Sequence, residues 1–269
     1  MPETYDETLH HAAYDTIDHV AEISDPGDRN RENHLWGDRF VIGIGNIAAW
    51  LFPVLMIAIV SQVFLRKAGV NQAWLDDAQW WLYGSALLAG FGYAITTDSH
   101  VRVDIFHEHF SDKKKARIEI FGLGWLLLPF LAVMTDILIH YSYSSFLARE
   151  GSDSPNGLHM LYLLKMLLPL LFVVAMMATW FALKRNFMVL TTPKLWHMLL
   201  GALPAAWFIA ERMAHNGLWW FVRLTNPELN PRRINREVIM EHTHWYGLAI
   251  VIALIALSIV MARRTPKKA

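Results

Sequence analysis

The sequence predicts an all-α integral membrane protein, with a four-helix core of tilted spans and a C-terminal extension of one or two further spans. Three observations support this fold class. Hydrophobic residues make up 54% of the chain, and its mean hydropathy is +0.26. Twelve tryptophans provide side chains that favour the level of the lipid headgroups. Several apolar runs reach the roughly 20 residues that an α-helix needs to cross a bilayer.

Composition and charge divide the chain into three parts: an acidic tail (1–38), a four-span core (39–185) and a C-terminal extension (186–269). The tail holds ten acidic residues and two arginines, so the remainder carries the excess of basic residues. No signal peptide is expected, because the first residues are acidic and lack an apolar core. The chain contains no cysteine, which excludes disulfides, thiolate chemistry and cysteine-based metal sites.

The tail has two interpretations. Leu9, Ala13, Ile17 and Val20 follow a helical spacing, which indicates an amphipathic helix that docks on a partner. The other interpretation is a solvated tail. Binding to an anionic bilayer is not expected, because the segment is itself acidic.

The core begins with a span from about Phe40 to Leu65, in which Pro53 is expected to introduce a kink. A second apolar run, Ala78 to Thr97, opens near paired tryptophans. The loop that follows, Asp98 to Arg117, is strongly basic. By the positive-inside rule this loop is cytoplasmic, which places the N-terminus in the cytoplasm as well.

The second half of the core continues this alternation. Ser111 is the predicted N-cap of a helix that leads into the third span, Ile120 to Tyr141. The loop to Gly157 has a single basic residue and is expected to face outward. The fourth span runs from Leu158 to Leu183 and ends on two basic residues, which return the chain to the cytoplasmic side.

The extension leaves its number of spans open. The segment 249–262 is the core of a convincing last span, and basic residues follow it. If these basic residues are cytoplasmic, the segment 195–222 also crosses and the chain has six spans. If that segment lies in the interface instead, there are five spans. Six is preferred, although it places Arg223, Arg232 and Arg236 outside.

Small residues recur along the second span. Ser85 and Ala89, and likewise Ala86 and Gly90, are separated by four positions, a spacing that lets membrane helices approach closely. The stripe packs either inside this chain's own bundle or against a larger membrane partner. A stripe of small residues does not distinguish the two.

Two charged residues lie within predicted spans. Asp136 is about one turn from the outer end of the third span, near His140. It is interpreted as an acid at the interface level, or as a residue that pairs with a partner or relays protons. Lys165 lies near the outer end of the fourth span, where it can reach the headgroups or an acid on a partner.

Four motifs in order carry a family resemblance. The run Leu88 to Ile95, which includes Tyr93, precedes the sequence HVRVD at 100–104. The motif WLDD at 74–77 lies upstream, and Lys165 with Pro169 lies downstream. Between about Trp50 and Leu183 the chain resembles the small, DctQ-type membrane subunit of TRAP (tripartite ATP-independent periplasmic) transporters.

The resemblance implies a subunit without a solute site of its own. Its partners would be the large TRAP membrane subunit, an extracytoplasmic solute-binding protein and phospholipids, and not nucleic acid. The implied process is sodium-driven uptake of organic acids across the bacterial inner membrane, with no cofactor. His100, Arg102 and Asp104 are expected to form a structural elbow where the chain leaves the second span and runs along the interface.

Two other classes of protein were weighed. The first is a haem-binding membrane anchor for electron transfer, because the chain has thirteen histidines. The second is a membrane enzyme, which is disfavoured because the sequence has no recognisable catalytic motif.

Overall fold

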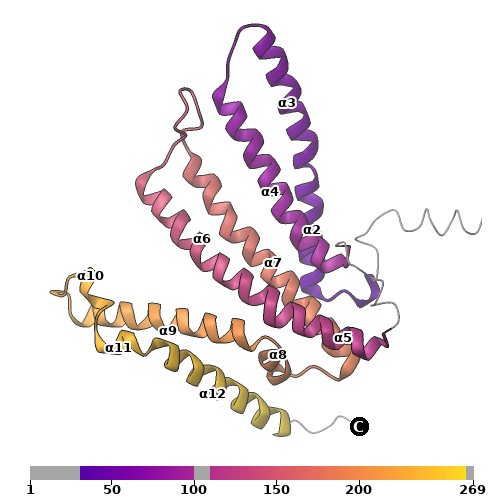
Figure 1. The fold of residues 1–269 in the computed structure, drawn as a ribbon, viewed down its shortest axis with the longest axis vertical. Helices are drawn as coiled ribbons and strands as arrows, with labels where there is room; N and C mark the ends of the chain where they lie inside the picture. Colours follow the sequence, from indigo (N-terminus) through magenta and orange to yellow (C-terminus); the bar gives the residue numbers. More distant parts are fainter. Residues whose placement is uncertain (1–30, 100–109, 265–269) are drawn as a thin grey trace, which may run out of the picture.

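The computed structural model describes residues 31–99 and 110–264, and no strand occurs among them. The helices follow one another in the order η1 (Arg31–Asn33), α2 (Trp36–Ala49), α3 (Leu51–Lys67), α4 (Ala73–Thr97), α5 (Asp112–Phe121), η2 (Gly122–Leu127), α6 (Leu128–Ala148), α7 (Leu161–Leu190), α8 (Leu195–Gly201), α9 (Leu203–Thr225), α10 (Pro231–Ile234), α11 (Val238–Glu241) and α12 (Thr243–Arg264). The predicted all-α membrane fold is confirmed (Figure 1).

Four helices in the described part of the chain are long and apolar enough to cross a membrane. They are Trp36–Lys67, Asp112–Ala148, Leu161–Leu190 and Thr243–Arg263. The predicted run Ala78 to Thr97 does form a helix, within α4, but α4 is not among these four helices. α4 instead packs between α2, α3 and α7.

The first membrane helix bends where the sequence predicts. α2 ends at Ala49 and α3 begins at Leu51, so the change of direction falls three residues before Pro53. Proline has no N–H, and Ala49 therefore loses the donor that would bond its carbonyl in a regular helix. The kink lets α2 pack on α4 and α7 while α3 runs on along α4.

The third membrane helix is continuous over 37 residues but is not α-helical throughout. α5 begins after Ser111, whose backbone carbonyl accepts the first bonds of the helix while its side chain makes no cap. The segment η2 widens into a π-helix before Pro129, which again removes one backbone donor. α6 then extends beyond the predicted end of the span.

One apolar core joins the bundle to the extension. Val41, Ile95 and Leu183 come from α2, α4 and α7. Met198 and Ala202, from α8 and the α8–α9 joint, lie in the same cluster. The extension therefore docks on the end of the core where α2 begins and α4 ends, rather than forming a separate body.

Beyond this joint, α9 and α12 form an antiparallel hairpin that crosses the bundle at a steep angle (Figure 1). α9 carries Glu211, Arg212 and Arg223 and is not among the four membrane-competent helices. The preference for six spans therefore stays a prediction.

Candidate functional site: ion pairs between helices and exposed apolar faces

A buried ion pair ties α2 to α7. Asp38 has no exposed surface, and the Arg185 guanidinium donates to its carboxylate. A second nitrogen of Arg185 donates to the Thr96 carbonyl near the end of α4, at 2.8 Å. The other Asp38 oxygen accepts the backbone N–H of Leu35 at 2.8 Å and so caps α2. One cation and one acid thus fix three helices at the same end.

His34 lies beside this pair, just before α2. Its side chain is buried, and its Nδ1 has no hydrogen-bond partner among the described residues. Burial lowers the pKa of His34, and the nearby Arg185 lowers it further. The imidazole is therefore neutral at physiological pH.

α4 ends at this cluster, where Asp98 adopts a left-handed conformation with φ 54°. The predicted elbow residues follow almost at once. His100, Arg102 and Asp104 lie outside the described residues, so their role stays a prediction.

At the opposite end of α4, the two aspartates of the WLDD motif accept hydrogen bonds from other elements of the chain. Asp76 accepts hydrogen bonds from Gln62 and from Arg66, the latter at 3.0 Å, and so ties α4 to α3. Asp77 accepts the backbone N–H of Leu158 at 3.0 Å. The two adjacent carboxylates therefore face different partners, one a helix and the other the loop that precedes α7.

Lys165 joins the ends of α6 and α7. Its Nζ donates to Glu150 at 2.5 Å and lies 4.5 Å from the centre of the Tyr141 ring. The hydrogen bond from Lys165 lowers the pKa of the Glu150 carboxyl. The partner that the sequence left open for Lys165 is thus an acid of the same chain.

The Lys165–Pro169 spacing has a structural explanation. Pro169 cannot donate to the Lys165 carbonyl, which a regular helix would require. The hydroxyl of Ser142, on α6, donates to this carbonyl at 2.7 Å. The proline therefore creates an acceptor through which α7 binds α6.

The small residues of α4 divide between two faces. Ser85, Ala86 and Ala89 are buried within the chain's own bundle. Gly90 is exposed, and a Cβ atom there would meet nothing within 4 Å. Tyr93 contacts α2, where its ring lies against Gly45.

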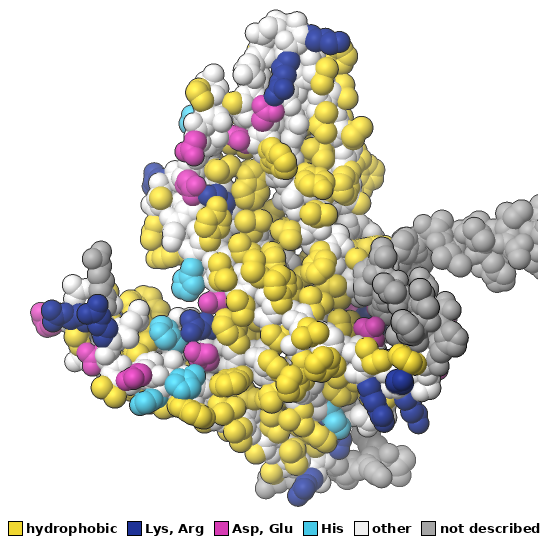
Figure 2. Space-filling view, viewed as in Figure 1, with side chains coloured by type: hydrophobic (Ala, Val, Ile, Leu, Met, Phe, Trp, Pro, Cys, Tyr) yellow, Lys and Arg dark blue, Asp and Glu magenta, His cyan; other side chains and the backbone are white. Residues whose placement is uncertain are grey.

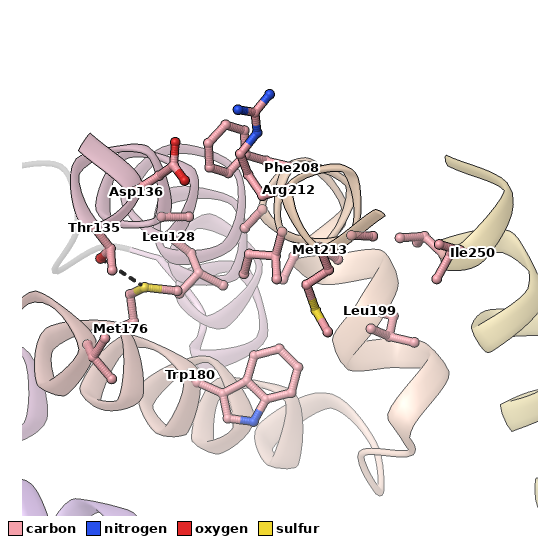
Figure 3. A pocket seen from close by; sticks show the side chains of 18 of the residues that line it. Leu128, Thr135, Asp136, Met176, Trp180, Leu199, Phe208, Arg212, Met213 and Ile250 are labelled. Carbon is pink, nitrogen blue, oxygen red and sulfur yellow. Dashed lines mark hydrogen bonds between the residues drawn. The ribbon is translucent and has the colours of Figure 1, made fainter. Parts of the chain in front are cut away.

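Asp136 is half-buried on α6. One oxygen lies 3.9 Å from Nε2 of His140, one turn along the same helix. Its carboxylate also lines the mouth of a groove between α6 and α9 (Figure 3).

Apolar side chains cover most of one face of the molecule (Figure 2), with Lys and Arg gathered at the tip of α3, at the start of α5 and at the far end of the hairpin. Of the four membrane-competent helices, the one formed by α2 and α3 is the least covered by the rest of the molecule. Only 6% of its most apolar stretch is buried. Trp50 and Phe64 are 74% and 67% exposed. Such a flank faces lipid or another membrane helix.

Sequence reasoning missed Asp38, Gln62 and Arg185. By composition Asp38 belongs to the acidic tail, and Arg185 belongs to the basic residues that end a span. Only the position of Asp38 gave a signal, because a lone acid two residues inside a membrane helix needs a partner. No group of three potential metal ligands occurs in the described residues.

These features define a helical membrane protein whose charged side chains hold its own helices together. A family model described as "Tripartite ATP-independent periplasmic transporters, DctQ component" matches residues 55–214, more than half of the chain. The chain belongs to this family. Comparison with curated proteins and with solved structures gave no match.

The family match confirms the resemblance and extends it past Leu183, to Ala214 in α9. The first part of the C-terminal extension therefore belongs to the family region. The family is one of transporter components, not of enzymes, and the haem alternative is not supported.

Proposed function

We propose that this chain is the small scaffold subunit of a TRAP transporter in the bacterial inner membrane, with its N-terminus in the cytoplasm. It supports the large permease subunit, which carries the solute and the coupling ion. Transport would be sodium-coupled, dependent on an extracytoplasmic solute-binding protein, and directed at organic acids.

One observation carries the scaffold role. Three cation–acid pairs join elements of the core: Asp38 with Arg185, Arg66 with Asp76, and Glu150 with Lys165. Charges that are paired in this way stiffen the bundle and are not available to bind an organic acid. A rigid bundle with exposed apolar flanks suits a support for a moving partner.

The proposal predicts that the chain alone transports nothing. Proteoliposomes that contain only this chain should take up no organic acid, whereas the chain with the large subunit, the binding protein and a sodium gradient should. Uptake by the chain alone would overturn the scaffold role.

Adjacent residues on α4 test the contact with the large subunit. Gly90→Leu places a side chain on an open face of α4, so it should leave the thermal stability of this chain unchanged or slightly raised and reduce co-purification of the large subunit. Ala89→Leu, at a buried position, should destabilise the chain itself by about 1–3 kcal/mol. Wild-type co-purification by a stable Gly90→Leu variant would remove this face from the interface.

A further inference from the structure

A large apolar groove separates the bundle from the C-terminal hairpin. It has a volume of about 780 Å³ and is lined by α6, α7, α9 and α12, with contributions from α8. Figure 3 shows Met176 and Trp180 of α7 on one wall and Met213 of α9 with Ile250 of α12 on the other. This volume falls within the roughly 300–1,000 Å³ of known small-molecule sites.

The groove follows from the way the hairpin leaves the bundle. α8 is held against α7, and α9 contacts η2 and α6, but α6 and α9 then diverge in a wedge (Figure 1). The lining residues near the apex of the wedge are small: Ala132, Ala202, Ala205 and Ala206. Their side chains are too short to close the gap between the helices.

The mouth of the groove holds one cation, Arg212, and one acid, Asp136. Arg212 of α9 donates to Glu211 at 3.3 Å and lies over the ring of Phe208. Its Nε is buried and has no hydrogen-bond partner among the described residues. Asp136 reaches the same mouth from α6 (Figure 3).

An apolar groove in a membrane protein does not stay empty. Water would find almost no polar partner on its walls, and a void would forfeit the dispersion contacts of the side chains that line it. Acyl chains are the apolar material that a bilayer supplies at this depth. The polar mouth then decides which headgroup fits.

We infer that the groove binds a zwitterionic phospholipid with a primary ammonium, of the phosphatidylethanolamine type. Its acyl chain would fill the groove between α6, α7 and the hairpin. Its phosphate would accept from the part of the Arg212 guanidinium that remains exposed, whose planar fork suits a phosphate oxygen pair. Its ammonium would lie beside Asp136, an acid that disfavours a purely anionic headgroup at this mouth.

Native mass spectrometry of the full-length chain, purified in mild detergent, tests this inference. The chain is exchanged into detergent that contains equal amounts of phosphatidylethanolamine, phosphatidylglycerol and phosphatidylcholine. We expect one phosphatidylethanolamine molecule to be retained. Arg212→Gln should weaken its retention about tenfold, the loss expected for a charge-assisted hydrogen bond.

Two further variants keep the test decisive. Ala206→Phe fills the groove without a change of charge and should expel the lipid even if Arg212→Gln proves unstable. Arg117→Gln removes an exposed arginine on α5, away from the groove, and should retain the lipid.

Three outcomes would overturn the inference. The first is equal or better retention of phosphatidylglycerol by the wild-type chain. The second is wild-type retention of phosphatidylethanolamine by the folded Ala206→Phe variant. The third is efficient cross-linking of a cysteine at Ala206 to the large subunit, which would assign the groove to a helix of that partner.

Discussion

The Asp38 carboxylate and the Arg185 guanidinium form an ion pair between α2 and α7, across 147 positions of sequence. Asp38 is fully buried, and only 15% of the Arg185 side chain is exposed. Because Arg185 also binds the Thr96 carbonyl, the pair sets the position of the end of α4. The segment that contains the predicted elbow starts three residues beyond Thr97.

Asp38→Ala should destabilise the chain by about 3–5 kcal/mol, because it leaves a largely buried guanidinium without its counter-charge. Thermal unfolding of the purified chain, followed by tryptophan fluorescence, measures the effect. Asp153→Ala removes an exposed acid and should change the stability by no more than about 0.5 kcal/mol.

The double variant Asp38→Leu with Arg185→Met separates a lost pair from lost packing. Apolar replacement of both members of a buried pair is often neutral or stabilising, so we expect most of the stability to return. A double variant as unstable as Asp38→Ala would mean that the charges, or their hydrogen bonds to Leu35 and Thr96, are required.

Ser142→Ala should cost about 1–3 kcal/mol, because the Lys165 carbonyl loses the donor that replaces the missing N–H of Pro169. Ser144→Ala, at an exposed position two residues further along α6, is the matched control. In a Pro169→Ala background the helix can supply its own N–H, and the cost of Ser142→Ala should shrink. If Ser142→Ala cost the same free energy of unfolding in both backgrounds, the role of Ser142 would not depend on the N–H that Pro169 lacks.

The Glu150–Lys165 pair should make stability depend on acidic pH. The pKa of Glu150 is lower in the folded chain than its ordinary value of 4.5. The pair therefore contributes its full stabilisation of the folded chain above about pH 4.5. This stabilisation is lost as the pH falls through the lowered pKa of Glu150 in the folded chain. Melting temperatures of wild type and Glu150→Gln should differ at pH 7 and converge in strong acid. A constant difference across this range would exclude the carboxylate as the titrating group.

The sequence was enough to place the helices but not to pair them. Apolar runs and Pro53 predicted three of the membrane helices of the core and the kink, because length, composition and a missing N–H act locally. The partners of Asp38 and Lys165 depend on which helices become neighbours, and periodicity carries no such information. The groove at Asp136 was hidden for the same reason, since it exists only where the hairpin diverges from α6.

The orientation of the chain remains a prediction with a clean test, because the sequence has no cysteine of its own. Single cysteines at Ser154, in the α6–α7 loop, and at Lys113, on α5, are both at exposed positions. In spheroplasts, an impermeant thiol reagent should label the first and spare the second until the membrane is opened. The reverse pattern would place the N-terminus outside.

Gly124 marks a close approach of the extension to the core. A Cβ atom at this position would lie 1.9 Å from the Gly201 carbonyl oxygen, a backbone atom that cannot move away alone. Gly124→Ala should therefore push α8 off the π-helical segment and destabilise the chain by about 1–3 kcal/mol. Limited proteolysis in the segment 191–194 should accelerate at the same time, because that linker loses its anchored end.

Gly122 is the matched control for this change. It lies in the same π-helical segment, but a Cβ atom there would meet nothing within 4 Å. Gly122→Ala should be neutral or stabilise the chain by up to about 1 kcal/mol, since alanine restricts the unfolded chain more than glycine. Any general effect of alanine on the π-helical segment is common to both variants. If the two variants lost equal stability, the cause would lie in the segment itself, and the contact between Gly124 and Gly201 would not be what holds the extension in place.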